Sequence, residues 1–213
     1  MNKRIFGYFL ALLATTASLL VLPARAADEA PDALIKRLST EVLESIRTDK
    51  AIQAGDNARI VALVDAKIMP NVNFQRMTAS AVGPAWRQAS AEQKARLQEE
   101  FKVLLVRTYA GALTQVSDQS IVIKPMRADP QDREVVVRTE VKGRGDAIEL
   151  DYRLEKTPGE GAGWKIYNLN VLGVWLVETY RSQFSQEINA KGLNGLITTL
   201  TERNKTNANA KKS

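Results

Sequence analysis

The clearest pattern in the chain is an alternation of apolar and polar residues between Arg133 and Lys156. Successive side chains of a β-strand point to opposite faces, so this alternation predicts two strands with one apolar and one polar face. The apolar set is Val135, Val137, Thr139 and Val141 in the first strand and Ile148, Leu150, Tyr152 and Leu154 in the second. Gly143 and Gly145 lie between the strands and permit a tight reversal. The pattern predicts a β-hairpin that needs an apolar cover on one face.

Helical periodicity accounts for the residues before the hairpin. Apolar positions three or four residues apart predict helices over residues 32–48, 55–70, 73–82 and 90 to about 115. Pro31 stands where a first helical turn tolerates proline, and Asn73 is a suitable cap for the third helix. Ser90 and Gln93 have the spacing of a capping box before the longest helix.

The order of the elements predicts an α+β fold. Strands at residues 120–126 and 164–171 join the hairpin, which gives a curved antiparallel sheet of about four strands. Helices return after Gly173, break at Gly192 and end near residue 203. The predicted helices wrap the sheet and enclose an apolar cavity, although periodicity does not say whether side chains fill it. The polar residues 204–213 are predicted to form a disordered tail.

The N-terminus has the form of an export signal. Lys3 and Arg4 precede an uncharged run over residues 5–22, and Pro23-Ala24-Arg25-Ala26 supplies small residues at a cleavage site. We expect cleavage after about Ala26 and location in the periplasm, with an uncleaved membrane anchor as the alternative. The absence of cysteine means that an exported chain folds without disulfides, which favours a bacterial envelope. Residues 27–203 then form a single domain with helical and sheet lobes.

The basic composition does not predict a nucleic-acid partner. The formal net charge is +6, but seven basic residues lie in the predicted signal or in and beside the tail. Residues 27–202 carry 23 basic against 24 acidic side chains, so a phosphate backbone would meet no dominant positive field. We expect no nucleic-acid partner.

The residue types present exclude most enzyme chemistry. The chain has no histidine and no cysteine, so it lacks the commonest general base, zinc ligands and thiol nucleophile. We expect no catalytic residues, no metal site and no cofactor. Carboxylates at Asp65, Asp151 and Glu178 remain, and a buried acid facing the cavity would permit a cone-fold isomerase as an alternative. A set of aromatic residues could line a ligand site or simply form core: Trp86, Tyr109, Tyr152, Trp164, Tyr167, Trp175 and Tyr180.

Two stretches carry a resemblance to a known family. The first combines residues 73–78, 81–83, 86–87, Gln93 and the run 101–113, which contains Arg107-Thr108-Tyr109-Ala110. The second combines residues 164–167, 173–174, 176–177 and 180–184, the last reading Tyr-Arg-Ser-Gln-Phe. Together they resemble the MlaC (toluene-tolerance) family of periplasmic phospholipid-binding proteins over nearly the whole mature chain. The chain departs from the pattern of the family at Asn168, Leu172 and Trp175.

The resemblance implies a nuclear-transport-factor-like sheet with added helices and a cavity that holds phospholipid acyl chains. It also implies two partners, an outer-membrane lipoprotein complex and an inner-membrane ABC transporter complex, between which a monomer carries lipid. The apolar stripes that converge on the sheet predict these lipid-binding residues: Leu104, Tyr109, Val135, Val137, Val141, Ile148, Leu150, Tyr152, Ile166, Trp175 and Val177. Arg87 and Arg107 are candidates for the headgroup by charge alone, with surface ion pairs as the alternative. The competing function is a lipid-free adaptor that docks between envelope complexes.

Overall fold

A computed structural model describes residues 29–129 and 131–209 of the chain. The predicted signal peptide, residues 1–26, lies outside the described residues, as do residues 210–213 of the predicted tail. In the described part, no helix is both long enough and apolar enough to cross a bilayer.

Five strands of the described chain form one antiparallel sheet in the order β1-β2-β3-β4-β5. They are β1 (Ser120–Ile123), β2 (Glu134–Lys142), β3 (Ile148–Lys156), β4 (Trp164–Val171) and β5 (Val174–Trp175). The predicted hairpin is confirmed as β2 and β3, in which Val137 pairs with Tyr152. The predicted α+β class is also confirmed. The strand count exceeds the expected four because β5 pairs with β4 before the last helix begins.

A β-bulge in β4 keeps the apolar face of the sheet continuous. Arg153 pairs with Asn168 and Leu154 pairs with Ile166, so Tyr167 is an extra residue on β4. One extra residue shifts the alternation of side chains by one position. Ile166 therefore shares the apolar face with Leu169, which pairs with Tyr152, while Asn168 lies on the opposite face.

The N-terminal helices differ in part from the prediction. α1 (Pro31–Thr48) begins at the expected proline, and the short α2 (Lys50–Gln53) follows it. The helix predicted over residues 55–70 is divided into α3 (Asn57–Leu63), a π-helical turn η1 (Val64–Ile68) and a 3-10 turn η2 (Met69–Asn71). Pro70 contributes to this change because it has no N–H to donate to the carbonyl four residues earlier.

The caps of the next two helices are as predicted. Asn73 accepts a hydrogen bond from the backbone N–H of Arg76 at the start of α4 (Phe74–Val82). Gly83, at φ 73°, ends that helix and leads into the 3-10 segment η3 (Gly83–Gln88). The capping box of Ser90 and Gln93 then opens α5 (Ala91–Leu113), the longest uninterrupted helix among the described residues.

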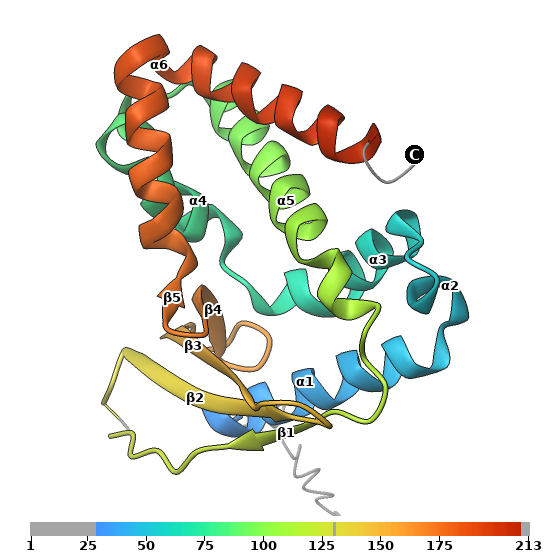
Figure 1. Ribbon diagram of the computed structural model, residues 1–213. Helices are drawn as coiled ribbons and strands as arrows, with labels where there is room; N and C mark the ends of the chain where they lie inside the picture. Colours follow the sequence, from blue (N-terminus) through green and yellow to red (C-terminus); the bar gives the residue numbers. More distant parts are fainter. Residues whose placement is uncertain (1–28, 130, 210–213) are drawn as a thin grey trace, which may run out of the picture.

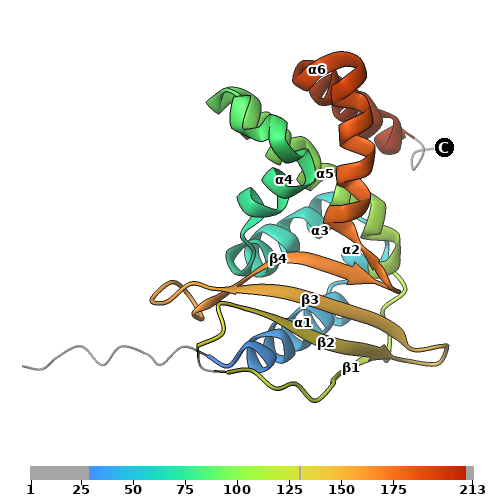
Figure 2. The same cartoon turned by 90° about the vertical axis from the view of Figure 1, so that its left-hand side faces the viewer.

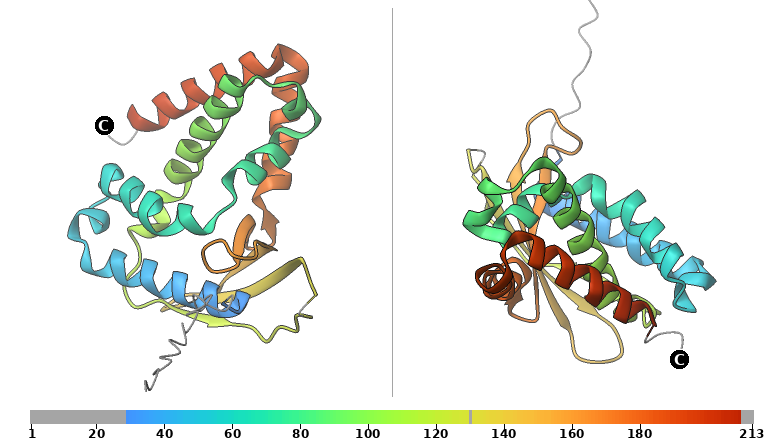
Figure 3. Two further views of the ribbon diagram at one scale, coloured as in Figure 1. Left: turned by 180° about the vertical axis from the view of Figure 1, so that it is seen from behind. Right: turned by 90° about the horizontal axis from the view of Figure 1, so that it is seen from above.

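The last helix, α6 (Leu176–Asn209), has a kink at Gly192, whose φ and ψ are 69° and −175°. Its two halves meet at a sharp angle in Figure 3. The predicted disorder from Asn204 is wrong for residues 204–209, which continue the helix. The reason is a tertiary contact: the buried Asn204 amide donates to the Glu100 carboxylate of α5 at 2.7 Å.

Three apolar clusters hold these elements together and surround an interior space. Helix α1 lies against the sheet and packs Leu34, Ile35 and Leu38 on Val135 and Val137 (Figure 2). Helices α4, α5 and α6 form a second layer at the β4 and β5 edge, centred on Phe101 (Figure 1). The third cluster joins α1, α2, α3 and α5. The candidate site lies where these clusters meet the sheet.

Candidate functional site

An apolar cavity of about 320 Å³ lies between the sheet, α1, the segment from α3 to η2, and α5. Its lining comprises Leu38, Ser39, Val42, Ile60, Val64, Ile68, Met69, Val72, Phe74, Met77, Lys102, Leu105, Val106, Tyr109, Leu113, Leu150, Tyr152, Ile166, Leu169 and Leu176. This volume lies at the lower end of the range found for ligand pockets, which is about 300–1,000 Å³. Because almost every lining side chain is hydrocarbon or aromatic, the cavity suits an apolar ligand.

One stripe of α5 forms a wall of the cavity. Lys102, Leu105, Val106, Tyr109 and Leu113 recur at helical spacing and line it. Other faces of the same helix pack elsewhere: Leu97, Phe101 and Leu104 belong to the cluster with α4 and α6. Helix α5 therefore divides its apolar surface between a filled core and the cavity.

The sheet forms the opposite wall. Tyr152 pairs with Leu169, and Leu154 pairs with Ile166, which places Tyr152, Leu169 and Ile166 on one face of neighbouring strands. Leu150, two positions before Tyr152, extends this face toward the hairpin turn. The bulge at Tyr167 is necessary here, because without it Asn168 and not Leu169 would point toward the cavity.

Two phenols lie in this apolar lining. Burial raises the pKa of the Tyr152 phenol, and hydrogen bonds with Ser39 and Thr139 offset only part of that rise. Burial likewise raises the pKa of Tyr109, and interaction with Tyr180 raises it further. Both phenols therefore stay neutral at physiological pH, so they add no anion to the cavity.

Lys102 is the one charged side chain among the described residues of the lining. Its ammonium hydrogen-bonds to Asp65 of η1 at 3.2 Å and lies 3.4 Å from Glu99 of α5. Burial lowers the pKa of Lys102, but the hydrogen bond to Asp65 and the charges of Glu99 and Asp65 together raise the pKa above its ordinary value. The group is a persistent cation that faces outward beside the cavity.

Four of the eleven predicted lipid-binding residues line the cavity: Tyr109, Leu150, Tyr152 and Ile166. Four others are buried in filled core: Val135 and Val137 beneath α1, and Leu104 and Val177 among α4, α5 and α6. Val141 is half-buried, and Ile148 is exposed at the hairpin end of β3. Trp175 lies on the polar face of the sheet, where the Arg153 guanidinium stacks 3.9 Å from its ring centre.

The two predicted headgroup residues are not brought together at this cavity. Arg87 is exposed on η3, and the Arg107 guanidinium donates to the backbone carbonyl of Asn204 on α6. Of the aromatic set, Tyr109 and Tyr152 line the cavity, whereas Trp164 and Tyr180 are core residues. The Arg76 guanidinium stacks 3.6 Å from the ring centre of Tyr167, on the polar face of the sheet. Sixteen lining residues were not in the predicted set: seven lie in residues 60–77, four on α5 and three on α1. The helical stripes of these segments were visible in the sequence, but periodicity does not say which of their residues face a cavity.

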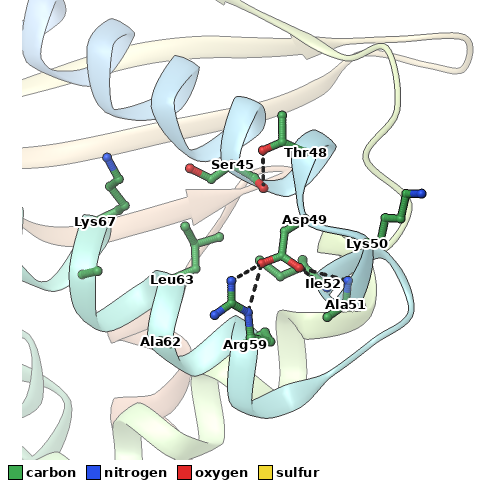
Figure 4. Close-up of a pocket in the computed structure, with 11 residues that line it drawn as sticks. Ser45, Thr48, Asp49, Lys50, Ala51, Ile52, Arg59, Ala62, Leu63 and Lys67 are labelled. Atoms are coloured by element: carbon green, nitrogen blue, oxygen red, sulfur yellow. Dashed lines mark hydrogen bonds and ion pairs between the residues drawn. The ribbon is translucent and has the colours of Figure 1, made fainter.

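A second hollow of about 800 Å³ lies beside the ends of α1, α2 and α3, and Figure 4 shows its lining. It is open, and its lining mixes charged and polar side chains with apolar ones. In its lining the Arg59 guanidinium lies 2.6 Å from one carboxylate oxygen of Asp49, and the second Asp49 oxygen accepts from the backbone N–H groups of Ala51 and Ile52 (Figure 4). The hydrogen bond from Arg59 is the largest influence that lowers the pKa of Asp49. The charges of Arg59 and Asp49 are paired with each other, and the lining is interrupted by charged groups in a way that the lining of the first cavity is not.

The fold and the cavity define an α+β protein built around an interior that accepts hydrophobic molecules. The profile of the MlaC protein family matches residues 36–202, so the chain belongs to the MlaC family. The resemblance inferred from the two sequence stretches is thereby confirmed.

Relatives of the chain agree with this membership. The chain is 27% identical over 167 residues to the toluene tolerance protein ttg2D of Pseudomonas putida, covering 78% of this chain and 76% of that protein. It is 23% identical over 196 residues to the intermembrane phospholipid transport system binding protein MlaC of Haemophilus influenzae, covering 92% of each.

A solved structure resembles the whole arrangement. The phospholipid-binding protein of Ralstonia solanacearum, in complex with a phospholipid, superposes with a TM-score of 0.80 at 43% identity. The match covers 85% of this chain and 99% of that chain.

Proposed function

We propose that this protein is a phospholipid carrier that holds acyl chains in the apolar cavity. The observation that carries the proposal is the cavity between β3, β4, α1 and α5, lined almost entirely by apolar side chains, in a member of the MlaC family. The Ralstonia relative, at 43% identity, is a phospholipid-binding protein in complex with a phospholipid, which supports the same ligand class. The name of the Haemophilus relative describes transport and binding, which favours a carrier over an enzyme.

The energetics of acyl chains agree with a carrier that never releases lipid into water. Roughly 30 methylene groups at about 0.8 kcal/mol each amount to about 25 kcal/mol, which exceeds the ceiling of non-covalent affinity. Exchange must therefore occur with another apolar site or with a membrane, where the free-energy difference between the two ends of the transfer is small.

The proposed setting is the periplasm. The name of the Haemophilus relative, a binding protein of an intermembrane phospholipid transport system, supports a carrier that exchanges lipid with membrane-bound complexes on both sides. We infer that these are an outer-membrane lipoprotein complex and an inner-membrane ABC transporter complex. We propose that the lipid contacts of this carrier are Tyr109, Leu150, Tyr152 and Ile166, together with the other cavity-lining residues of α5.

Native mass spectrometry of protein purified without detergent tests the proposal. The expected result is an added mass equal to an intact diacyl phospholipid, with the same lipid recovered by extraction. Bare protein after gentle purification would instead favour the adaptor. A bound fragment of a lipid, such as a free fatty acid, that accumulates on incubation with vesicles would favour an enzyme.

A further inference from the structure

The position of Lys102 combines an apolar stem with a charged end. The residue begins the cavity-lining stripe of α5, ahead of Leu105, Val106, Tyr109 and Leu113. Its side chain is 22% exposed, and its ammonium reaches Asp65 and Glu99, which are 47% and 57% exposed. A lysine in such a position lays its methylenes along apolar surface and keeps its charge at the water boundary. The ammonium therefore marks the rim of the cavity.

The two carboxylates hold Lys102 only weakly. Ion pairs with partners this exposed contribute about 0–1 kcal/mol, because water screens them. A flexible ammonium can therefore exchange one carboxylate for another anion that approaches the rim. A phosphodiester is such an anion, and lysine binds phosphate as a point charge.

We propose that Lys102 binds the phosphate of the phospholipid whose acyl chains occupy the apolar cavity. This inference rests on the proposed function and adds the group that selects a phosphate-bearing lipid over a neutral lipid with the same tails. Phosphate displaces Asp65 from the ammonium, since both anions compete for one cation. Asp65 and Lys102 also join η1 to α5, so their separation frees η1 at one side of the cavity when lipid enters.

The test compares two lipids that differ only in the headgroup. Vesicles of phosphatidylcholine contain a minor fraction of diacylglycerol with identical acyl chains, and the protein is equilibrated with them and then separated. Mass spectrometry of the bound lipid gives the ratio of phosphatidylcholine to diacylglycerol, normalised to the ratio in the vesicles. In wild-type protein we expect the ratio to favour phosphatidylcholine. In Lys102→Gln we expect it to fall about fivefold, which corresponds to about 1 kcal/mol, while Lys102→Arg retains it.

Two further variants make the interpretation specific. Asp65→Asn removes the competing carboxylate, so the ratio is expected to rise above that of wild type. Lys67→Gln is the matched control, because it removes a lysine that is likewise ion-paired but does not line the cavity. Lys67 lies on η1, as Asp65 does, and pairs with Glu41 at 3.3 Å. The ratio of this variant should equal that of wild type. Inorganic phosphate at the same concentration as the lipid phosphate should not change the ratio, and a fall would reassign the site to free phosphate and overturn the proposal.

The outcomes separate this inference from the proposed function. If Lys102→Gln binds both lipids in the wild-type ratio, the phosphate assignment is overturned and the carrier function stands. If wild-type protein binds neither lipid, the proposed function itself fails.

Discussion

Leu150 and Ile148 lie two positions apart on the same face of β3, but only Leu150 lines the cavity. Ile148 is 42% exposed near the hairpin turn. We predict that Leu150→Asp lowers the amount of co-purified phospholipid at least about tenfold. A carboxylate against hydrocarbon costs more than the roughly 1.4 kcal/mol that a factor of ten represents. Extracted lipid per mole of folded protein is the measurement.

The matched control for this prediction is Ile148→Asp. It introduces the same charge on the same strand face outside the cavity lining, so lipid occupancy should remain at the wild-type level. Equal loss of lipid in both variants would contradict the placement of the cavity. Val137→Asp is unsuitable for this comparison, because Val137 has no exposed surface and a charge there would unfold the domain.

Leu172 carries an unusual backbone conformation in the turn before β5. Its φ is 50°, followed by Gly173 at 85°, and 63% of the leucine is exposed. Leucine pays a steric cost in this region that asparagine largely avoids, and little packing is lost on substitution. We predict that Leu172→Asn raises the free energy of unfolding by about 0.5–1 kcal/mol. The urea midpoint should rise with an unchanged m-value.

Leu172→Val is the control for this prediction, because it should change the stability in the opposite direction. Valine is also apolar, but its branched Cβ tolerates positive φ least, so this variant should be less stable than wild type. A higher midpoint for valine than for asparagine would refute the backbone explanation and point to a packing role for the side chain.

Among the elements, the junction of β4 with α6 depends on a small polar group. The buried Asn168 side chain accepts from the backbone N–H of Val177 at 3.1 Å and donates to Glu178 at 2.7 Å. The Arg153 guanidinium donates to the other oxygen of Glu178. Burial raises the pKa of Glu178, but the hydrogen bonds from Asn168 and Arg153 outweigh it and hold the pKa below its usual 4.5.

This depressed pKa makes the junction sensitive to acid. The unfolded carboxyl takes up a proton at a higher pH than the folded one, so the stabilisation is complete above about pH 4.5 and is lost as pH falls through the folded pKa. We predict that Glu178→Gln lowers the free energy of unfolding at pH 7 by up to about 1 kcal/mol, since Glu178 is half-exposed. The difference from wild type should vanish below the folded pKa, as measured by urea unfolding at a series of pH values.

Glu160→Gln is a control for the loss of any surface carboxylate. Glu160 pairs with Lys165 across an exposed loop and has 67% of its side chain exposed. Its variant should differ little from wild type at any pH. A deficit of Glu178→Gln that persists undiminished in acid would show that shape, and not charge, accounts for the effect.

The elements themselves could be predicted from the sequence because their patterns are local. The alternation in β2 and β3, the cap at Asn73 and the capping box at Ser90 need only neighbouring residues. The division of the apolar face was not local. Val137 and Tyr152 are cross-strand neighbours, yet Val137 is covered by α1 while Tyr152 faces the cavity. Which side chains of the sheet are covered depends on where α1 crosses the strands. The periodicity of the sequence carries no information about that position.

The same limit applies to α5 and to the bulge. Leu104 and Leu105 are adjacent in sequence, but Leu104 is buried within the cluster of α4, α5 and α6, whereas Leu105 is only partly buried against that cluster and also lines the cavity. An apolar stripe that includes both residues does not show which part of the helix surface packs against other side chains and which part lines a cavity. In β4, the extra residue Tyr167 decides that Leu169 and not Asn168 faces inward, and no simple alternation indicates a bulge there.

At the scale of the whole molecule, the cavity is surrounded by parts of unequal rigidity. The cluster of α4, α5 and α6 is dense, with Phe101 centred 5.0 Å from Tyr180 and 5.2 Å from Phe184. The wall formed by η1 and η2 has a π-helical and a 3-10 turn in place of a regular helix, and ion pairs to Glu41 and Lys102 join η1 to α1 and α5. Because about 320 Å³ is at the lower end of the range for pockets that hold drug-sized ligands, about 300–1,000 Å³, a larger diacyl lipid requires this cavity to widen.

Widening is expected where the wall is least rigid. We predict that removal of lipid changes hydrogen exchange most in residues 64–71, which lose an apolar partner and have few regular helical hydrogen bonds. The core-facing part of α6 around Phe184 should keep its protection. Exchange followed by mass spectrometry, before and after detergent extraction of the lipid, measures the difference, and reloading from vesicles should reverse it. Leu150→Asp, purified without lipid, should reproduce the lipid-free pattern without extraction. A uniform rise in exchange across both layers would mean that lipid stabilises the fold globally, and η1 would then have no special part in admitting it.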